Sequence, residues 1–156
     1  MPSIQIAVAE DEQRLCERLR EQLECLPDLE ITSGARNGRE VITTAGRLVP
    51  DILILDIDLP GMCGLELLQV VRWCSPDTKV IVLSNHTEEA IIREAIEIGA
   101  KGYLVKGDGA DMAKVIRAVQ RGEVWTRRRI LAEVLNQLIS LAGLDVQAIE
   151  DKPAPA

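Results

Sequence analysis

The amino-acid sequence predicts an α/β fold built on a parallel sheet with helices on both faces. The first observation is that residues 52–55 (Ile-Leu-Ile-Leu) are apolar at every position, as in a strand buried on both faces. The second is that five short apolar runs alternate with five segments of helical periodicity. The third is that short links join them, which favours right-handed crossovers between parallel strands.

Each predicted strand is a short apolar run, at residues 4–9, 29–33, 52–55, 79–83 and 103–105. The predicted helices repeat apolar residues at helical spacing and span residues 15–26, 38–49, 64–73, 87–98 and 107–121. Thr87 is expected to cap the fourth helix, and Leu48 is expected to point inward from the second. Five strands joined in this way predict a flavodoxin-like (βα)5 doubly wound sheet in the order 2-1-3-4-5.

Length and composition limit the possible classes of protein. The 156 residues allow one compact domain and a tail, and an apolar share of 47% is ordinary for a globular domain. A net charge of -7 argues against binding nucleic acid by bulk electrostatics. The sequence shows no signal-peptide pattern, and no apolar run approaches the ~20 residues that span a membrane. We therefore expect a cytoplasmic protein with no membrane partner.

Four cysteines lack the close paired spacing of a zinc site: Cys16, Cys25, Cys63 and Cys74. We interpret them as reduced thiols of a cytosolic protein, mostly buried or half-buried.

Polar residues gather where the predicted strands end. In the order 2-1-3-4-5, the first and third strands are neighbours, so Glu10 and Asp11 lie beside Asp56. The fourth and fifth strands end at Ser84 and Lys106 on the same edge. Asp56 alone is equally well explained as the cap of a turn. Three acids, a hydroxyl and an ammonium group from four parts of the chain indicate a functional site.

This set of groups suits phosphoryl chemistry with a metal ion. Three carboxylates repel one another, and Mg²⁺ relieves the repulsion with only a few oxygen ligands. Asp11 and Asp56 are the best candidate ligands, and the segment Ile57-Asp58 can add a backbone carbonyl. A carboxylate can also attack a phosphoryl group to form an acyl phosphate. The metal, the ammonium group and the hydroxyl would then stabilise the charge on the phosphoryl oxygens.

In combination and order, these motifs resemble the receiver domain of two-component response regulators. The motifs are Glu10-Asp11, residues 54–61 (Ile-Leu-Asp-Ile-Asp-Leu-Pro-Gly), Ser84 after a hydrophobic strand, and residues 103–106 (Tyr-Leu-Val-Lys). The resemblance covers about residues 4 to 122.

The resemblance implies a phosphorylation switch with self-dephosphorylation chemistry rather than a metabolic enzyme. Asp56 would accept the phosphoryl group from the phosphohistidine of a sensor histidine kinase, and Lys106 would contact that group. Ser84 would move toward the phosphoryl oxygens and Tyr103 would turn inward, which changes the protein surface. The implied magnesium ligands are Glu10, Asp11, Asp56 and the backbone carbonyl of Asp58.

Some positions depart from the common family pattern. The first acid is Glu10, where the family more often has Asp, so we expect it to reach the metal only through water. Gly107-Asp108 replaces the proline that many receivers carry after the lysine, which matches the LuxR/NarL-type subclass. Residues 122–125 and 84–86 match the same subclass. His86 is interpreted either as a solvated loop residue, the commoner case, or as a side chain that affects phosphoryl hydrolysis.

The end of the chain differs from the predicted receiver domain at residues 1–122. Residues 123–143 hold an amphipathic helix that begins after three arginines, and residues 144–156 form a polar, Pro/Ala-rich linker. This helix could dock on the receiver or pair with a second copy in a homodimer. DNA contact is expected only through an output domain absent from this chain. A stand-alone receiver that acts through protein–protein contacts is the alternative.

Two other functional classes fit less well. Asp56-Ile57-Asp58 has the two-acid spacing of haloacid-dehalogenase-type phosphatases, but Leu59-Pro60-Gly61 follows it and the chain has no room for a cap. A purely structural interaction domain would have no need of the complete acid, serine and lysine set.

Overall fold

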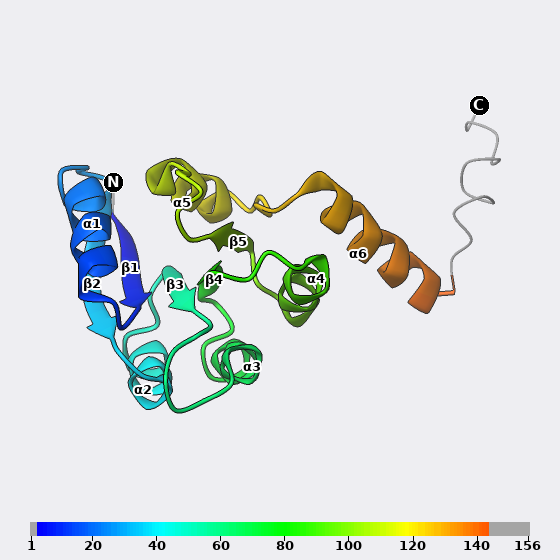
Figure 1. Cartoon of the computed structure of the whole chain (residues 1–156), viewed down its shortest axis with the longest axis horizontal. Helices are drawn as coiled ribbons and strands as arrows, with labels where there is room; N and C mark the ends of the chain where they lie inside the picture. Colours follow the sequence, from blue (N-terminus) through cyan, green and yellow to red (C-terminus); the bar gives the residue numbers. More distant parts are fainter. Residues whose placement is uncertain (1–2, 144–156) are drawn as a thin grey trace.

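Five parallel strands form one sheet in the order β2-β1-β3-β4-β5, which confirms the predicted fold (Figure 1). The computed structural model describes residues 3–143. The strands are β1 (Ile4–Ala9), β2 (Leu29–Ala35), β3 (Ile52–Asp56), β4 (Lys79–Ser84) and β5 (Gly102–Val105). Strand β3 lies at the centre and is buried at every position, as its unbroken apolar run predicts.

Helices cover both faces of the sheet, and each face has its own apolar core. The helices are α1 (Gln13–Glu24), α2 (Gly38–Leu48), α3 (Gly64–Cys74), α4 (Glu89–Ile98), α5 (Met112–Gln120) and α6 (Arg128–Leu141). One core joins the sheet to α1 and α5, for example through Leu23 and Ile116. The other joins the opposite face to α2, α3 and α4, for example through Val41 and Leu68. None of the helices within residues 3–143 is long and apolar enough to cross a membrane.

Close packing after β3 fixes the loop that follows Asp56. A Cβ atom at Gly64, the first residue of α3, would lie 1.9 Å from the carbonyl oxygen of Ile57. Only glycine therefore allows α3 to start this close to the strand. This contact holds the loop at residues 57–63 against the carboxyl end of the sheet.

The chain returns to the sheet edge after α5. The amide of Tyr103 donates to the carbonyl of Trp125 at 2.9 Å, and the amide of Trp125 donates to the carbonyl of Lys101 at 2.8 Å. Helix α6 then packs on α4 and buries Ile130 and Val134 in the core on the α2–α4 side. Docking on its own domain, one of the two arrangements open from sequence, is therefore present, and pairing with a second copy through the exposed side of the helix stays a prediction.

Several local predictions are wrong. Leu48 is the last residue of α2 and is 50% exposed, not inward. Thr87 caps no helix, because α4 begins two residues later with Glu88 at its N-cap position and no side-chain cap. Helix α5 begins at Met112, since Gly107 and Gly109 both have positive φ and break a helix there.

Two further differences concern β2 and the cysteines. Strand β2 continues two residues beyond the predicted end, to Ala35, and its register with β1 shifts once. All four cysteines are free, but Cys25, Cys63 and Cys74 are exposed and only Cys16 is half-buried. The expectation that most of them are buried is therefore wrong.

Candidate functional site

Asp56 is the last residue of the central strand, and its carboxylate is held from two sides. The side chain is 1% exposed. Its Oδ1 accepts a hydrogen bond from the amide of Asp58 at 2.8 Å, and its Oδ2 accepts one from Lys106 Nζ at 2.9 Å. Lys106 directly follows the edge strand β5, and its amide donates to the carbonyl of Ser84, the last residue of β4, at 2.8 Å. Strand order thus brings together two groups that are 50 residues apart in the sequence.

Glu10 and Asp11 reach the same edge from β1, which pairs directly with β3. The side chain of Glu10 is 0% exposed, and its Oε1 accepts from the amide of Glu12 at 3.1 Å. Its Oε2 lies 3.2 Å from Lys106 Nζ, yet it is buried without a hydrogen bond among the described residues. Asp11 is exposed. Glu10, which was expected from the sequence to reach a metal ion only through water, is therefore the buried acid of this pair, and Asp11 is the exposed one.

The electrostatics of the site follow from this burial. Burial raises the pKa of Glu10 from 4.5 to about 7; the amide of Glu12 lowers it and the nearby charge of Asp56 raises it further. For Lys106, burial alone favours the neutral amine, but the hydrogen bond and charge of Asp56 and the charge of Glu10 raise its pKa overall. The buried site therefore favours positive charge and resists further negative charge.

The three acids fit a hard divalent cation. Glu10, Asp11 and Asp56 each offer a ligand oxygen, and these oxygens lie within 4.8 Å of one another. The Oε2 of Glu10, which is buried and makes no hydrogen bond among the described residues, is an acceptor that such a cation would satisfy. Mg²⁺ suits carboxylate ligands and keeps several of its own waters, so this set is sufficient. Metal coordination by the backbone carbonyl of Asp58 stays a prediction.

Ser84 and Tyr103 are joined through the backbone of His86. Ser84 is 0% exposed, and its Oγ accepts from the amide of His86 at 3.0 Å. The hydroxyl of Tyr103 donates to the carbonyl of His86 at 2.9 Å, and the ring is 6% exposed. Burial raises the pKa of this hydroxyl above its ordinary value. The inward position expected of Tyr103 after switching is the position that it has in this structure.

The side chain of His86 also connects two loops, a contact that sequence reasoning missed. Its Nε2 lies 3.0 Å from Oδ1 of Asp58, and its Nδ1 lies 3.6 Å from Glu88. The loops after β3 and β4 are therefore tied together beside Asp56. The only sequence signal was the position of His86, two residues after Ser84. His86 is thus a loop residue with a 43% exposed side chain that also contacts Asp58, and an effect on phosphoryl hydrolysis stays a prediction.

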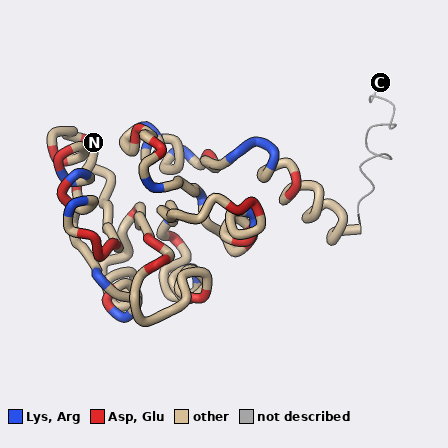
Figure 2. The backbone as a smooth tube through the Cα atoms, in the orientation of Figure 1, with Lys and Arg blue, Asp and Glu red and all other residues tan. Residues whose placement is uncertain are grey.

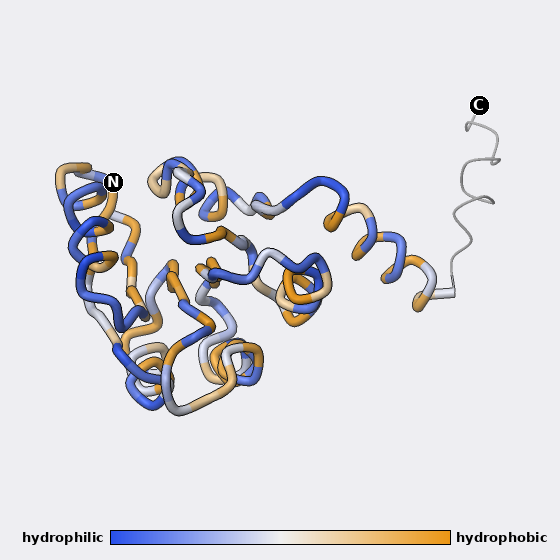
Figure 3. The backbone as a smooth tube through the Cα atoms, in the orientation of Figure 1, coloured by the Kyte–Doolittle hydropathy of each residue, from blue (hydrophilic) through white to orange (hydrophobic). Residues whose placement is uncertain are grey.

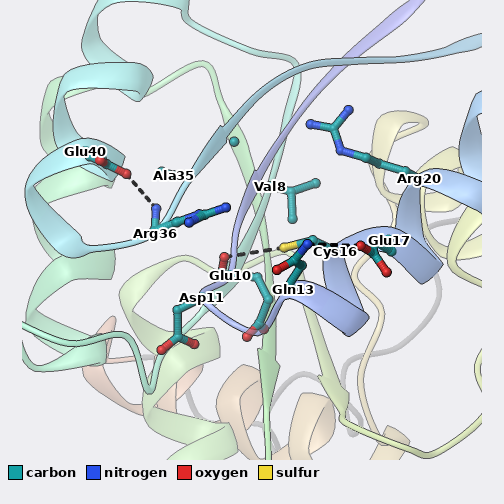
Figure 4. Close-up of a pocket in the computed structure, with 11 residues that line it drawn as sticks. Val8, Glu10, Asp11, Gln13, Cys16, Glu17, Arg20, Ala35, Arg36 and Glu40 are labelled. Carbon is teal, nitrogen blue, oxygen red and sulfur yellow. Dashed lines mark hydrogen bonds between the residues drawn. The ribbon is translucent and has the colours of Figure 1, made fainter.

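A pocket of about 560 Å³ lies next to the acidic residues, between the start of α1 and the end of β2 (Figure 4). Arg36 and Cys16 point toward one another across it, and Glu10 and Asp11 line it. The Cys16 thiol donates to the carbonyl of Glu10 at 3.4 Å. Burial and the charge of Glu10 raise the pKa of this thiol, which keeps it protonated. Asp56 does not line the pocket, so the reactive edge and the pocket are adjacent but distinct.

Comparisons with known proteins agree with this geometry. Residues 6–119 match the family described as response regulator receiver domain. The chain is 33% identical over 135 residues to the transcriptional regulatory protein LnrK of Bacillus subtilis, covering 86% of this chain and 61% of LnrK. It is 37% identical over 117 residues to protein-glutamate methylesterase/protein-glutamine glutaminase 2 of Carboxydothermus hydrogenoformans, covering 74% of this chain and 33% of that protein.

A solved structure shows the same arrangement. The crystal structure of a LuxR-family two-component response regulator from Aurantimonas sp. matches 88% of this chain and 99% of its own, with a TM-score of 0.75 and 25% identity. The chain thus matches a solved structure over nearly that structure's full length, but spans only about three fifths of LnrK.

Proposed function

Because this chain belongs to the response regulator receiver family, we propose that it is a phosphorylation switch whose acceptor is Asp56. The observation that carries the proposal is the buried Asp56 carboxylate at the end of the central strand, with Lys106 bonded to it and two other acids beside it. A carboxylate oxygen attacks the phosphorus of a kinase phosphohistidine. The new O–P bond forms as the P–N bond breaks, and the electron pair of the P–N bond stays with the imidazole.

The residues around Asp56 have separate tasks in this proposal. The amide of Asp58 and the ammonium group of Lys106 orient the carboxylate before attack. Lys106 and the hydroxyl of Ser84 then provide a charge and a hydrogen bond for the transferred oxygens. Mg²⁺ bound by Glu10, Asp11 and Asp56 would neutralise the charge that gathers there.

His86 is the connection through which the site would change the surface. Its amide is bonded to Ser84, its carbonyl to Tyr103 and its side chain to Asp58. If Ser84 Oγ turns to the phosphoryl oxygens, it releases the amide of His86 and moves the loop that leads into α4. The two states need differ by only a few kcal/mol for phosphorylation to shift the balance between them.

The output of the switch is proposed from the relatives. LnrK is a transcriptional regulatory protein and is longer than the matched region. We infer a cytoplasmic regulator whose DNA contact belongs to a helix-turn-helix output domain outside this chain. A stand-alone receiver is not favoured, since LnrK and the C. hydrogenoformans methylesterase both have a further region.

Intact mass measurement tests the acceptor. The protein is incubated with Mg²⁺ and acetyl phosphate, and we expect a single phosphoryl adduct that is absent in EDTA and in Asp56→Asn. Asp77→Asn is the matched control, because Asp77 is exposed and far from the site in the sequence. Absence of an adduct in the wild-type protein, or its survival in Asp56→Asn, refutes the assignment.

A further inference from the structure

Helix α6 has apolar residues on two sides, and only one side is covered within the described residues. Ile130 and Val134 face α4 and are 0% and 6% exposed. Three other residues, which we call the leucine stripe, are 37%, 56% and 57% exposed: Leu131, Leu135 and Leu138. Leu141 is 78% exposed but lies at the same angle around the helix as Ile130 and Val134. On a helix, positions 131, 135 and 138 fall on one side, and the recurring apolar positions along α6 are visible in Figure 3. Three exposed leucines on one side of a helix indicate a contact surface.

The leucine stripe continues into a groove against α4. The groove has a volume of about 240 Å³ and is lined by Ile96, Val134, Leu138 and Leu141, among others. A salt bridge joins the two helices that form this groove, since Arg93 of α4 lies 2.8 Å from Glu133 of α6. The surface is therefore preformed, and a partner helix can bind without first ordering it.

We propose that the leucine stripe binds the α6 helix of a second copy of this chain in an antiparallel orientation. The spacing of Leu131, Leu135 and Leu138, four and then three residues apart, is the coiled-coil spacing, which is complementary to a second helix of the same sequence. An antiparallel pair related by a two-fold axis places Leu135 opposite Leu138 of the partner. The two α4 helices would then flank the pair.

The charges at the two ends of α6 favour a second copy of this helix as the partner, and they favour the antiparallel orientation. Helix α6 has Arg127 at its N-cap position, begins with Arg128 and Arg129, and has no acid in its first turn, as the basic start of the helix in Figure 2 shows. Its last turn has no basic residue, and acids follow it in the sequence at positions 145, 150 and 151. An antiparallel pair brings each basic start near the negative end of the other helix. A parallel pair would instead bring six arginines together.

A self-complementary surface of this kind predicts a symmetric dimer. An unrelated partner would need the same apolar spacing and the opposite charge at both ends, and a second copy meets both conditions at once. The dimer does not depend on phosphorylation of Asp56, so it stands or fails separately from the proposed function.

Sedimentation velocity over a range of protein concentrations tests the interface. We expect a monomer–dimer equilibrium in the wild type, and at least about tenfold weaker association in Leu135→Glu and in Leu138→Glu. Trp73→Glu is the control, because Trp73 is an 88% exposed apolar residue on α3. Circular dichroism and thermal unfolding check that each variant is folded. A wild type that is monomeric at every concentration, or a dimer that both leucine variants retain, overturns the proposal.

Disulfide trapping tests the orientation in a background that lacks the four native cysteines. In an antiparallel pair, position 131 lies opposite position 142, and disulfides need Cα atoms within about 7 Å. A mixture of Leu131→Cys and Ala142→Cys proteins should therefore form a cross-linked heterodimer under mild oxidation. Leu131→Cys alone should not cross-link to itself. Self-linking of Leu131→Cys without the mixed product would indicate a parallel pair and overturn the orientation.

Discussion

Replacement of Glu10 by glutamine should stabilise the metal-free protein in a pH-dependent way. Glu10 is an acid with a fully buried side chain, and burial raises its pKa from 4.5 to about 7. The folded protein therefore holds a proton on Glu10 more tightly than the unfolded chain does. The stability linked to this proton is fully present below pH 4.5, falls as the pH rises, and is lost above about pH 7.

The size of the effect follows from the two pKa values. At about 1.4 kcal/mol for each pH unit between 4.5 and about 7, the charged Glu10 costs the folded state about 3 kcal/mol above pH 7. Glutamine has nearly the same shape and stays neutral. The stability of Glu10→Gln relative to wild type should therefore rise by up to about 3 kcal/mol between pH 5 and pH 8.

Urea unfolding in EDTA at several pH values measures this difference. Other titrating groups contribute to both proteins and largely cancel. Glu66→Gln is the control, because Glu66 is exposed at the start of α3 and its replacement should give a difference that is flat with pH. If the stability difference between Glu10→Gln and the wild type does not change with pH, burial does not raise the pKa of Glu10. Added Mg²⁺ at pH 8 should stabilise the wild type more than the variant, because the variant loses one of the three negatively charged ligands.

Three other changes test packing and backbone strain in the domain. Gly64→Ala should lower stability by about 2–3 kcal/mol, because the new Cβ would overlap Ile57. Gly46→Ala is its control and should stabilise α2 by about 0.5–1 kcal/mol, because a Cβ there has no other atom within 4 Å. Equal urea midpoints for the two variants would contradict this. Val49→Asn should raise stability by about 1 kcal/mol, because valine has a φ of 44° there; a lower thermal midpoint would argue against backbone strain. Arg93→Ala removes the bond to Glu133 and should speed hydrogen exchange in α6 but not in β3; unchanged exchange in α6 would show that the ion pair does not hold it.

The position of Asp56, the proposed acceptor, beside Glu10 and Lys106 was predictable because it depends on strand order alone. A run of apolar residues at every position identifies β3 as a buried central strand, and short crossovers place β1 beside it. The residue after each such strand then lies on one edge of the sheet. Asp56, Glu10 and Lys106 meet there whatever the details of packing.

The tertiary structure alone decided which side chains are buried at that edge and what covers the helices. Glu10 and Asp11 are neighbours in sequence, but Glu10 is buried beside Lys106, 96 residues away, whereas Asp11 is exposed. His86 bonds to Asp58 because two separate loops approach each other, which no local spacing reports. The helical pattern of residues 131–142 likewise predicted an amphipathic α6. Which of its apolar residues face α4 and which stay exposed depends on how Trp125 joins the sheet edge, and therefore on contacts between segments distant in the sequence.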